Sequence, residues 1–157
     1  PTIRPLWPAL GRRQIRRRPP LALSIRRVEY FNTSVRDRPG AAYEVLSQLA
    51  AAKVNLLAFS AVPTGADQAQ LVIFPDNVRQ FVRAAEDHGL VLLGPSRALL
   101  VQGDDKLGAF ADIHRKLSEA QINVFASNGV TDGRDGFGYI VYVRPEDFDR
   151  AARVLGV

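Results

Sequence analysis

Residues 37–89 and residues 105–156 carry the same sequence pattern, and this internal repeat constrains the fold more than any other feature. Most matches lie 68 positions apart, and after one deletion the offset becomes 67 positions. So many matches in the same order exceed chance, and a repeat of this length indicates paired small domains rather than a solenoid. The pairs at offset 68 are Asp37 and Asp105, Gly40 and Gly108, Ala41 and Ala109, Leu49 and Leu117, Ala52 and Ala120, Asn55 and Asn123, Ala58 and Ala126, Val62 and Val130, Gly65 and Gly133, and Asp67 and Asp135; those at offset 67 are Phe81 and Phe148, Arg83 and Arg150, Ala84 and Ala151, Ala85 and Ala152, and Gly89 and Gly156.

The spacing of apolar residues predicts the order β-α-β-β-α-β in the first copy. Two amphipathic helices are expected, because apolar residues recur at the i, i+3, i+4 and i+7 spacing of one helical face. Gly89 closes the second of them in the usual C-terminal position. The expected strands cover residues 25–31, 54–59, 70–74 and 90–93, and the helices are marked by Ala42, Val45, Leu46 and Leu49 and by Val78, Phe81, Val82 and Ala85.

The second copy repeats this order but stops at Val157, directly after its last helix. It therefore has no room for a fourth strand. We expect that strand position to remain uncovered or to be filled by a neighbouring chain, which favours a homodimer. The expected strands cover residues 98–101, 122–126 and 137–143, and the helices are marked by Phe110, Ile113, Leu117 and Ala120 and by Phe148, Ala151, Ala152 and Leu155.

Residues 1–22 form a basic tail in front of the repeat. Eight arginines and no acidic residue lie within residues 1–28, whereas 16 acidic residues outnumber the other 13 basic residues. Proline blocks regular structure and like charges repel, so we expect the tail to be disordered. It is either an extension without a role or a basic arm that contacts nucleic acid or an acidic surface. The first domain is then expected at residues 23–94 and the second at residues 95–157.

The composition removes several classes of function. The chain has no cysteine, which excludes disulfides, thiolate metal sites and a cysteine nucleophile, and with only two histidines no metal or other cofactor is expected. No serine has the setting of a nucleophile elbow, so no catalytic residue is assigned and no enzyme is expected. No apolar run approaches the ~18 residues of a membrane span or the ~7–15 residues of a signal-peptide core. We expect a cytoplasmic protein without a membrane anchor.

The residues that lead into the first helix of each copy carry a recognisable motif. Residues 37–41 read Asp-Arg-Pro-Gly-Ala, and after the helix residues 53–57 read Lys-Val-Asn-Leu-Leu. This pattern resembles the ACT domain, in which an acidic-x-Pro-Gly turn precedes the first helix and an asparagine enters the second strand. The second copy matches at residues 105–109 and 121–124, with Leu107 in place of the proline. The resemblance covers residues 24–157.

The resemblance implies an α+β protein with two tandem ferredoxin-like βαββαβ copies, each with an antiparallel sheet and helices on one face. A stand-alone tandem ACT protein is expected to sense an amino acid or similar metabolite and to regulate an enzyme or transcription. In the family, the ligand lies between the turn of one domain and the second-strand region of its partner. The implied ligand-binding residues are Asp37, Arg38, Pro39, Gly40, Ala41, Asn55 and Ser60 in the first copy, and Asp105, Lys106, Leu107, Gly108, Ala109, Asn123, Ser127 and Asn128 in the second.

These residue types suit a free amino acid. A helix N-terminus offers unpaired N–H groups to a carboxylate, and Gly40 and Gly108 let the backbone approach closely. The carboxylates of Asp37 and Asp105 accept hydrogen bonds from an ammonium group. Both turns are expected to face one crevice between the domains.

Structural roles for the same residues stay open. Asp37 and Asp105 are good helix N-caps, worth ~1 kcal/mol each without any ligand. Asn55 and Asn123 have the amide groups to bridge helix to strand by hydrogen bonds.

Nucleic-acid binding is the alternative function. A ferredoxin-like sheet can serve as an RNA platform, and the arginine-rich tail adds charge. Neither copy, however, carries the basic-Gly-aromatic signature of an RNA-binding strand. An amino-acid-binding regulatory role therefore leads, and a nucleic-acid partner is not expected.

Overall fold

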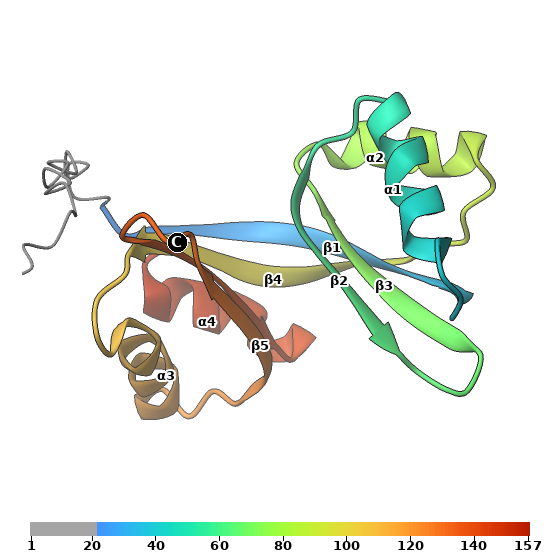
Figure 1. The fold of residues 1–157 in the computed structure, drawn as a ribbon. Helices are drawn as coiled ribbons and strands as arrows, with labels where there is room; N and C mark the ends of the chain where they lie inside the picture. Colours follow the sequence, from blue (N-terminus) through green and yellow to red (C-terminus); the bar gives the residue numbers. More distant parts are fainter. Residues whose placement is uncertain (1–21) are drawn as a thin grey trace, which may run out of the picture.

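The two longest strands, β1 (Ser24–Arg36) and β4 (Leu93–Asp104), lie side by side at the centre of one six-stranded sheet (Figure 1). The structure is a computed structural model that describes residues 22–157, so the expected disorder of the tail lies outside the described residues, apart from Ala22. The strand order is β2-β3-β1-β4-β6-β5, and every neighbouring pair is antiparallel. One shared sheet thus replaces the two separate sheets expected from the sequence.

The order β-α-β-β-α occurs twice along the described chain, as the apolar spacing predicts. In each half the first strand, β1 or β4, is followed by a helix, a β-hairpin and a second helix. The remaining elements are α1 (Ala41–Ala51), β2 (Leu56–Pro63), β3 (Gln68–Pro75) and α2 (Val78–Asp87), then α3 (Ala109–Glu119), β5 (Val124–Thr131), β6 (Gly136–Val143), a short 3-10 helix (Pro145–Asp147) and α4 (Phe148–Leu155). None of the helices within residues 22–157 is long and apolar enough to cross a membrane.

The sequence suggested two strands where the structure has only β4. Residues 90–93 and 98–101 were expected as separate strands, with the domain boundary at 94/95. Gly94 and Pro95 instead lie within β4, where the two residues oppose Phe31 of β1 and shift the register between Tyr30 and Asn32. Because the hydrogen-bond ladder is interrupted there, the N–H group that proline lacks is not needed, and the strand continues through the turn-like dipeptide.

The fourth strand that the second half lacks is supplied by β1 of the same chain. The first part of β1, from Ser24 to Tyr30, pairs with β4 from Gln102 to Ser96, on the side of β4 that β6 does not occupy. This strand position is therefore filled within the chain. The expectation of an open position or a neighbouring chain there was wrong, and the free edges of the sheet are β2 and β5.

Each half has its own helix-covered core. In the first half Val45 and Leu49 of α1 and Phe81 of α2 pack on Leu71 and Ile73 of β3. The second half has a corresponding cluster of buried side chains beneath α3 and α4. It consists of Leu99, Val101, Ile113, Leu117, Ile122, Phe137, Tyr139, Val141, Val143, Phe148, Ala151, Ala152 and Leu155.

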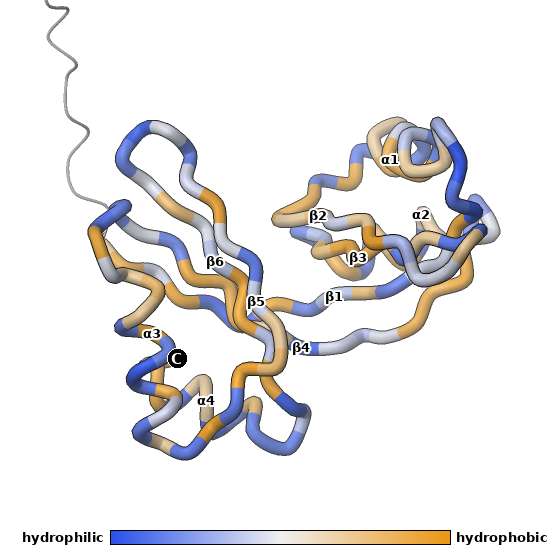
Figure 2. Tube along the Cα trace, turned by 60° about the horizontal axis from the view of Figure 1, so that its bottom comes forward, coloured by the Kyte–Doolittle hydropathy of each residue, from blue (hydrophilic) through white to orange (hydrophobic). Residues whose placement is uncertain are grey.

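The helix-free face of the sheet is concave and partly closes on itself. Phe74 of β3 and Tyr142 of β6 have ring centroids only 6.1 Å apart, although β1 and β4 separate their strands. In a flat sheet three strand spacings would place them about 14 Å apart. Tyr30 lies between them, with centroids 5.1 Å from Phe74 and 5.4 Å from Tyr142. Figure 2 shows the β2–β3 and β5–β6 hairpins standing apart on either side of β1 and β4.

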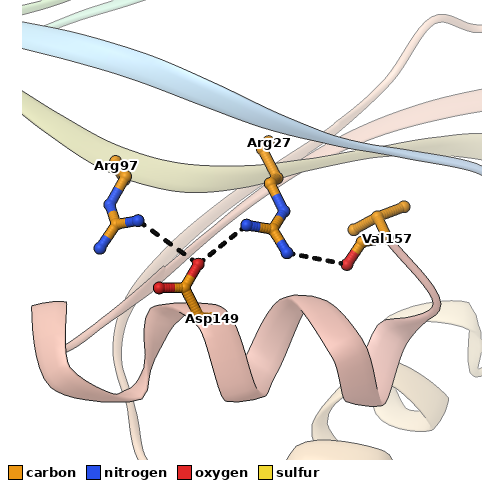
Figure 3. Close-up of polar contacts among 4 residues, drawn as sticks. All are labelled: Arg27, Arg97, Asp149 and Val157. Carbon is orange, nitrogen blue, oxygen red and sulfur yellow. Dashed lines mark hydrogen bonds and ion pairs between the residues drawn. The ribbon is translucent and has the colours of Figure 1, made fainter.

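An ionic cluster ties α4 to the two central strands (Figure 3). Asp149 accepts hydrogen bonds from Arg27 of β1 at 2.8 Å and from Arg97 of β4 at 3.4 Å. Arg27 also donates to the backbone oxygen of Val157, and the Arg97 guanidinium lies 4.3 Å from the centre of the Phe148 ring. The ion-paired side chains are about half exposed, so each pair contributes at most about 1 kcal/mol.

Candidate functional site

The two helix-start turns, residues 37–41 and 105–109, are built in the same way. α1 begins after Gly40 (φ 91°) and α3 after Gly108 (φ 83°), both in the left-handed region that favours glycine. The backbone N–H of Asp37 donates to the carbonyl of Asp67 at 3.0 Å, and that of Asp105 donates to the carbonyl of Asp135 at 2.9 Å. The offset of 68 positions found in the sequence therefore recurs in the backbone geometry.

Within residues 22–157 no side chain caps α1 or α3, which corrects one of the structural roles expected for the aspartates. The N-cap residues are Gly40 and Gly108, three positions after Asp37 and Asp105. The aspartates contribute backbone amides, not carboxylates, to the local hydrogen bonding. Space around both glycines is open, since a Cβ built there meets no atom within 4 Å. The start of each helix is thus accessible and uncapped.

The other predicted residues of the turns differ in their surroundings. Arg38 donates to both carboxylate oxygens of Glu44, at 2.8 and 2.7 Å. Pro39, Lys106 and Leu107 are exposed, and the side chain of Ala41 is buried. Ala109 is half-buried.

Asn55 and Asn123 are exposed, and their side chains make no hydrogen bond within residues 22–157. The expected helix-to-strand bridge by these asparagines was therefore wrong. Gln80 instead provides such a bridge in the first half, donating to the carbonyls of Ala52 and Lys53.

The two turns do not face one crevice. Since β1 and β4 are antiparallel neighbours, the turns that follow them lie at opposite ends of the central strand pair (Figure 1). Lys106, Leu107 and Ala109 line a hollow of about 370 Å³ beside α3. Ser60 and Asn128 line a larger one, described next. The predicted residues are thus distributed over the sheet, and Ser127 lies on the exposed edge strand β5 outside both hollows.

A groove of about 840 Å³ runs along the concave face between the two hairpins. We call it the inter-hairpin groove. Its apolar walls come from strands that are distant in sequence, and polar groups line it at intervals. The apolar lining includes Leu57, Phe74, Leu100, Ile140 and Tyr142, and the polar lining includes Ser24, Ser60, Gln102, Asn128 and Asp132.

Of the residues that line this groove, only Ser60 and Asn128 were predicted from the sequence as ligand-binding residues. A signal was present in the apolar runs at residues 71–74 and 139–143, which lack the alternation of a sheet with one solvated face. Such runs indicate strands that are covered on both faces. Here helices cover one face, and the curled sheet itself covers the other.

Burial changes the chemistry of one group in the groove. Tyr142 is 8% exposed, and this burial, with a smaller electrostatic effect from Tyr30, raises the pKa of its phenol to about 12. The aromatic rings on this face pack on one another, so they do not form the open stacking platform of an RNA-binding sheet.

The histidines have structural partners. The His114 ring contacts the hydroxyl of Tyr139, and His88 Nδ1 lies 2.8 Å from the carbonyl of Ala84. Within residues 22–157 no group of three or more His, Asp or Glu side chains is placed to hold a metal ion. In the same part of the chain every buried side-chain nitrogen and oxygen has a hydrogen-bond partner.

Comparison with known proteins places the fold. No protein-family model and no curated protein matches the sequence. Among solved structures, the chain is similar to protein BT0572 from Bacteroides thetaiotaomicron, with a TM-score of 0.72 and 16% identity over 83% of this chain and 88% of that chain. It is also similar to the regulatory subunits of aspartate kinase from Thermus thermophilus (ligand-free form) and Thermus flavus, with TM-scores of 0.60 and 0.56. Their identities are 16% and 15%, over 87% of this chain and 95% of each of theirs. The chain has an α+β, ACT-like fold.

Proposed function

We propose that this protein is a regulatory module of the ACT type, built from two ACT-like units, that binds an amino acid or a closely related metabolite. The observation that carries the proposal is the uncapped helix-start turn, formed twice with the same backbone geometry. The likeness to regulatory subunits of aspartate kinase supports a regulatory role. The units correspond to residues 23–94 and 95–157, and β1 and β4 serve both.

Each turn has groups for both ends of an amino acid. The N-terminus of α1 or α3 attracts a carboxylate through its N–H groups and partial positive charge. The carboxylates of Asp37 and Asp105 accept from an ammonium group. Asn55 and Asn123 follow the far ends of α1 and α3, so we propose that their amide oxygens come to a turn from a second copy of the chain. The two sites are not equivalent, since Pro39 in one corresponds to Leu107 in the other.

A second copy of the chain completes the proposed sites. The turns follow the central strands β1 and β4, whereas Ser60, Ser127 and Asn128 are on the edge strands β2 and β5. A homodimer that pairs free edges would bring a second-strand region to a turn. We propose that the ligand acts through this assembly or on a partner enzyme or transcription regulator.

The test is a screen of the twenty amino acids at millimolar concentration by thermal shift, followed by isothermal titration of those that stabilise the protein. The double variant Asp37→Asn, Asp105→Asn is expected to weaken binding by about tenfold or more, because a hydrogen bond between charged groups is worth ~1.5–3 kcal/mol. The control variant Glu86→Gln, Asp87→Asn removes the same charge from α2 and is expected to bind like the parent protein. A screen without heat or thermal shift for any amino acid would refute the proposed ligand class.

A further inference from the structure

We propose that the inter-hairpin groove binds an amphiphilic anion, a small carboxylate with an apolar body, and that Arg26 anchors its charge. This site is separate from the helix-start turns and goes beyond the function proposed above.

The groove has the size and lining of a small-molecule site. Sites of this kind measure about 300–1,000 Å³ and are mostly apolar with a few polar groups. The 840 Å³ groove has Leu57 and Phe74 on one wall, Ile140 and Tyr142 on the other, and Leu100 on its floor. These side chains belong to or pack against one apolar cluster, which forms the base of the groove. An apolar body of a ligand removes this surface from water.

Arg26 puts a positive charge beside the groove, next to two of its lining residues, Leu100 and Gln102. It lies opposite Leu100 in the β1–β4 register, and residues opposite each other on neighbouring strands project from the same face. Its Nη2 donates to Oε1 of Gln102 at 3.2 Å, and both Leu100 and Gln102 line the groove.

Among the described residues no carboxylate forms an ion pair with Arg26. The neighbouring Arg27, in contrast, pairs with Asp149. The amide oxygen of Gln102 accepts from Arg26, which leaves the Gln102 NH₂ group to donate to a bound anion. A guanidinium with an adjacent amide donor matches the two oxygens of a carboxylate.

Asp132 is the acidic residue in the lining, and it lies in the β5–β6 loop. Its Oδ1 accepts from the backbone N–H groups of Arg134 at 2.7 Å and Gly136 at 2.9 Å. These bonds orient the carboxylate toward its own loop. Its charge still opposes an anion, so Asp132→Asn is expected to strengthen binding of a carboxylate by a few fold and to weaken binding of a cation.

The experiment uses the full chain and three probes of equal length: octanoate, 1-octanol and octylamine. Isothermal titration and thermal shift are expected to show saturable binding of octanoate, with 1-octanol and octylamine at least tenfold weaker. Arg26→Gln is expected to weaken octanoate by about tenfold or more. Arg36→Gln is the matched control, because it removes the same charge from the other end of β1, away from the groove.

A second variant tests the position of the ligand. Gly138 lines the groove, and a Cβ built there meets no atom within 4 Å. Gly138→Val therefore adds a branched side chain inside the groove, from a Cβ that has open space, and is expected to abolish octanoate binding. Should this variant fail to fold, the comparison of Arg26→Gln with Arg36→Gln still decides the proposal.

The outcomes separate this site from the helix-start turns. Amino-acid binding is expected to persist in Arg26→Gln, and octanoate binding is expected to persist in Asp37→Asn, Asp105→Asn. The proposal is overturned by an absence of octanoate binding, by equal binding of 1-octanol, or by unchanged octanoate affinity in Arg26→Gln. Amino-acid binding at the turns would stand in each of these cases.

Discussion

Tyr142 lies where the two halves of the curled sheet meet, packed against Tyr30 and Phe74. Its neutral phenol is favoured there, because the surrounding apolar side chains disfavour the tyrosinate charge. The pKa of about 12 compares with an ordinary value of about 10. Between these values the unfolded chain loses the proton and the folded chain keeps it.

The direction of the pH dependence follows. A folded-state pKa above the unfolded value stabilises the protein fully below pH 10, and this contribution is lost as pH rises toward 12. Two pH units correspond to at most about 2–3 kcal/mol. Urea unfolding from pH 9 to 12 is expected to show that Tyr142→Phe lacks this part of the alkaline loss.

Tyr43 provides the matched control, since its side chain is 74% exposed. Tyr43→Phe is expected to lose stability with pH as the parent protein does. Parallel stability curves for the parent protein and Tyr142→Phe would contradict the buried position of the Tyr142 phenol.

At the scale of elements, Gly129 determines how closely α3 approaches β5. A Cβ at this position would lie 2.8 Å from the Phe110 ring and 3.0 Å from the Tyr139 ring. These two rings stack with centroids 4.4 Å apart. The close packing of helix on edge strand therefore depends on the absence of a side chain at Gly129.

Gly129→Ala is expected to destabilise the protein by about 1–3 kcal/mol, because Phe110 must leave its packed position. Gly138→Ala on the adjacent strand β6 is the control and is expected to be near neutral, since its Cβ has open space. Chemical denaturation measures the change in the free energy of unfolding for both variants. Equal midpoints for the two variants would show that Phe110 adjusts without loss of packing.

Local sequence patterns predicted the secondary structure of this chain better than the pairing of its distant segments. The apolar spacing predicted every helix and the order of the hairpins, because these features depend on neighbours within a few positions. The dipeptide Gly94-Pro95 indicated a break, but β4 continues because these two residues are accommodated opposite Phe31 of β1, more than sixty positions earlier. The groove escaped prediction for the same reason, since Leu57, Leu100 and Tyr142 meet only after the sheet has curled.

At the scale of the whole molecule, β1 and β4 contribute to both halves. Phe31 of β1 belongs to the first helix-covered core, and Ile25 of the same strand packs on the second. On the concave face, Val28 belongs to one buried cluster with Phe74 of the first half and Tyr142 of the second. Neither half can lose its sheet without removing a strand from the other, so we expect unfolding in one cooperative step.

Leu71→Ala in the first core and Leu117→Ala in the second test this expectation. Both side chains are fully buried, and each variant is expected to lose about 2–5 kcal/mol. Hydrogen exchange is expected to show that either change reduces protection equally in peptides from α1 and from α3. Loss of protection confined to the substituted half would mean that the halves unfold separately.

The irregularity between Tyr30 and Asn32 has a mechanical consequence for the two hairpins. On one side of it, residues 24–30 of β1 and 96–102 of β4 form a regular ladder, which resists bending and sliding, and on the other side Asn32 pairs with Leu93. At the irregularity the ladder is interrupted, so torsion of the central strand pair is concentrated there. A small rotation at this midpoint would widen or narrow the space between β2 and β5 while both helix-covered cores remain rigid. We therefore expect the two strands to twist most easily at this point. A molecule held between the hairpins would then set the angle between them.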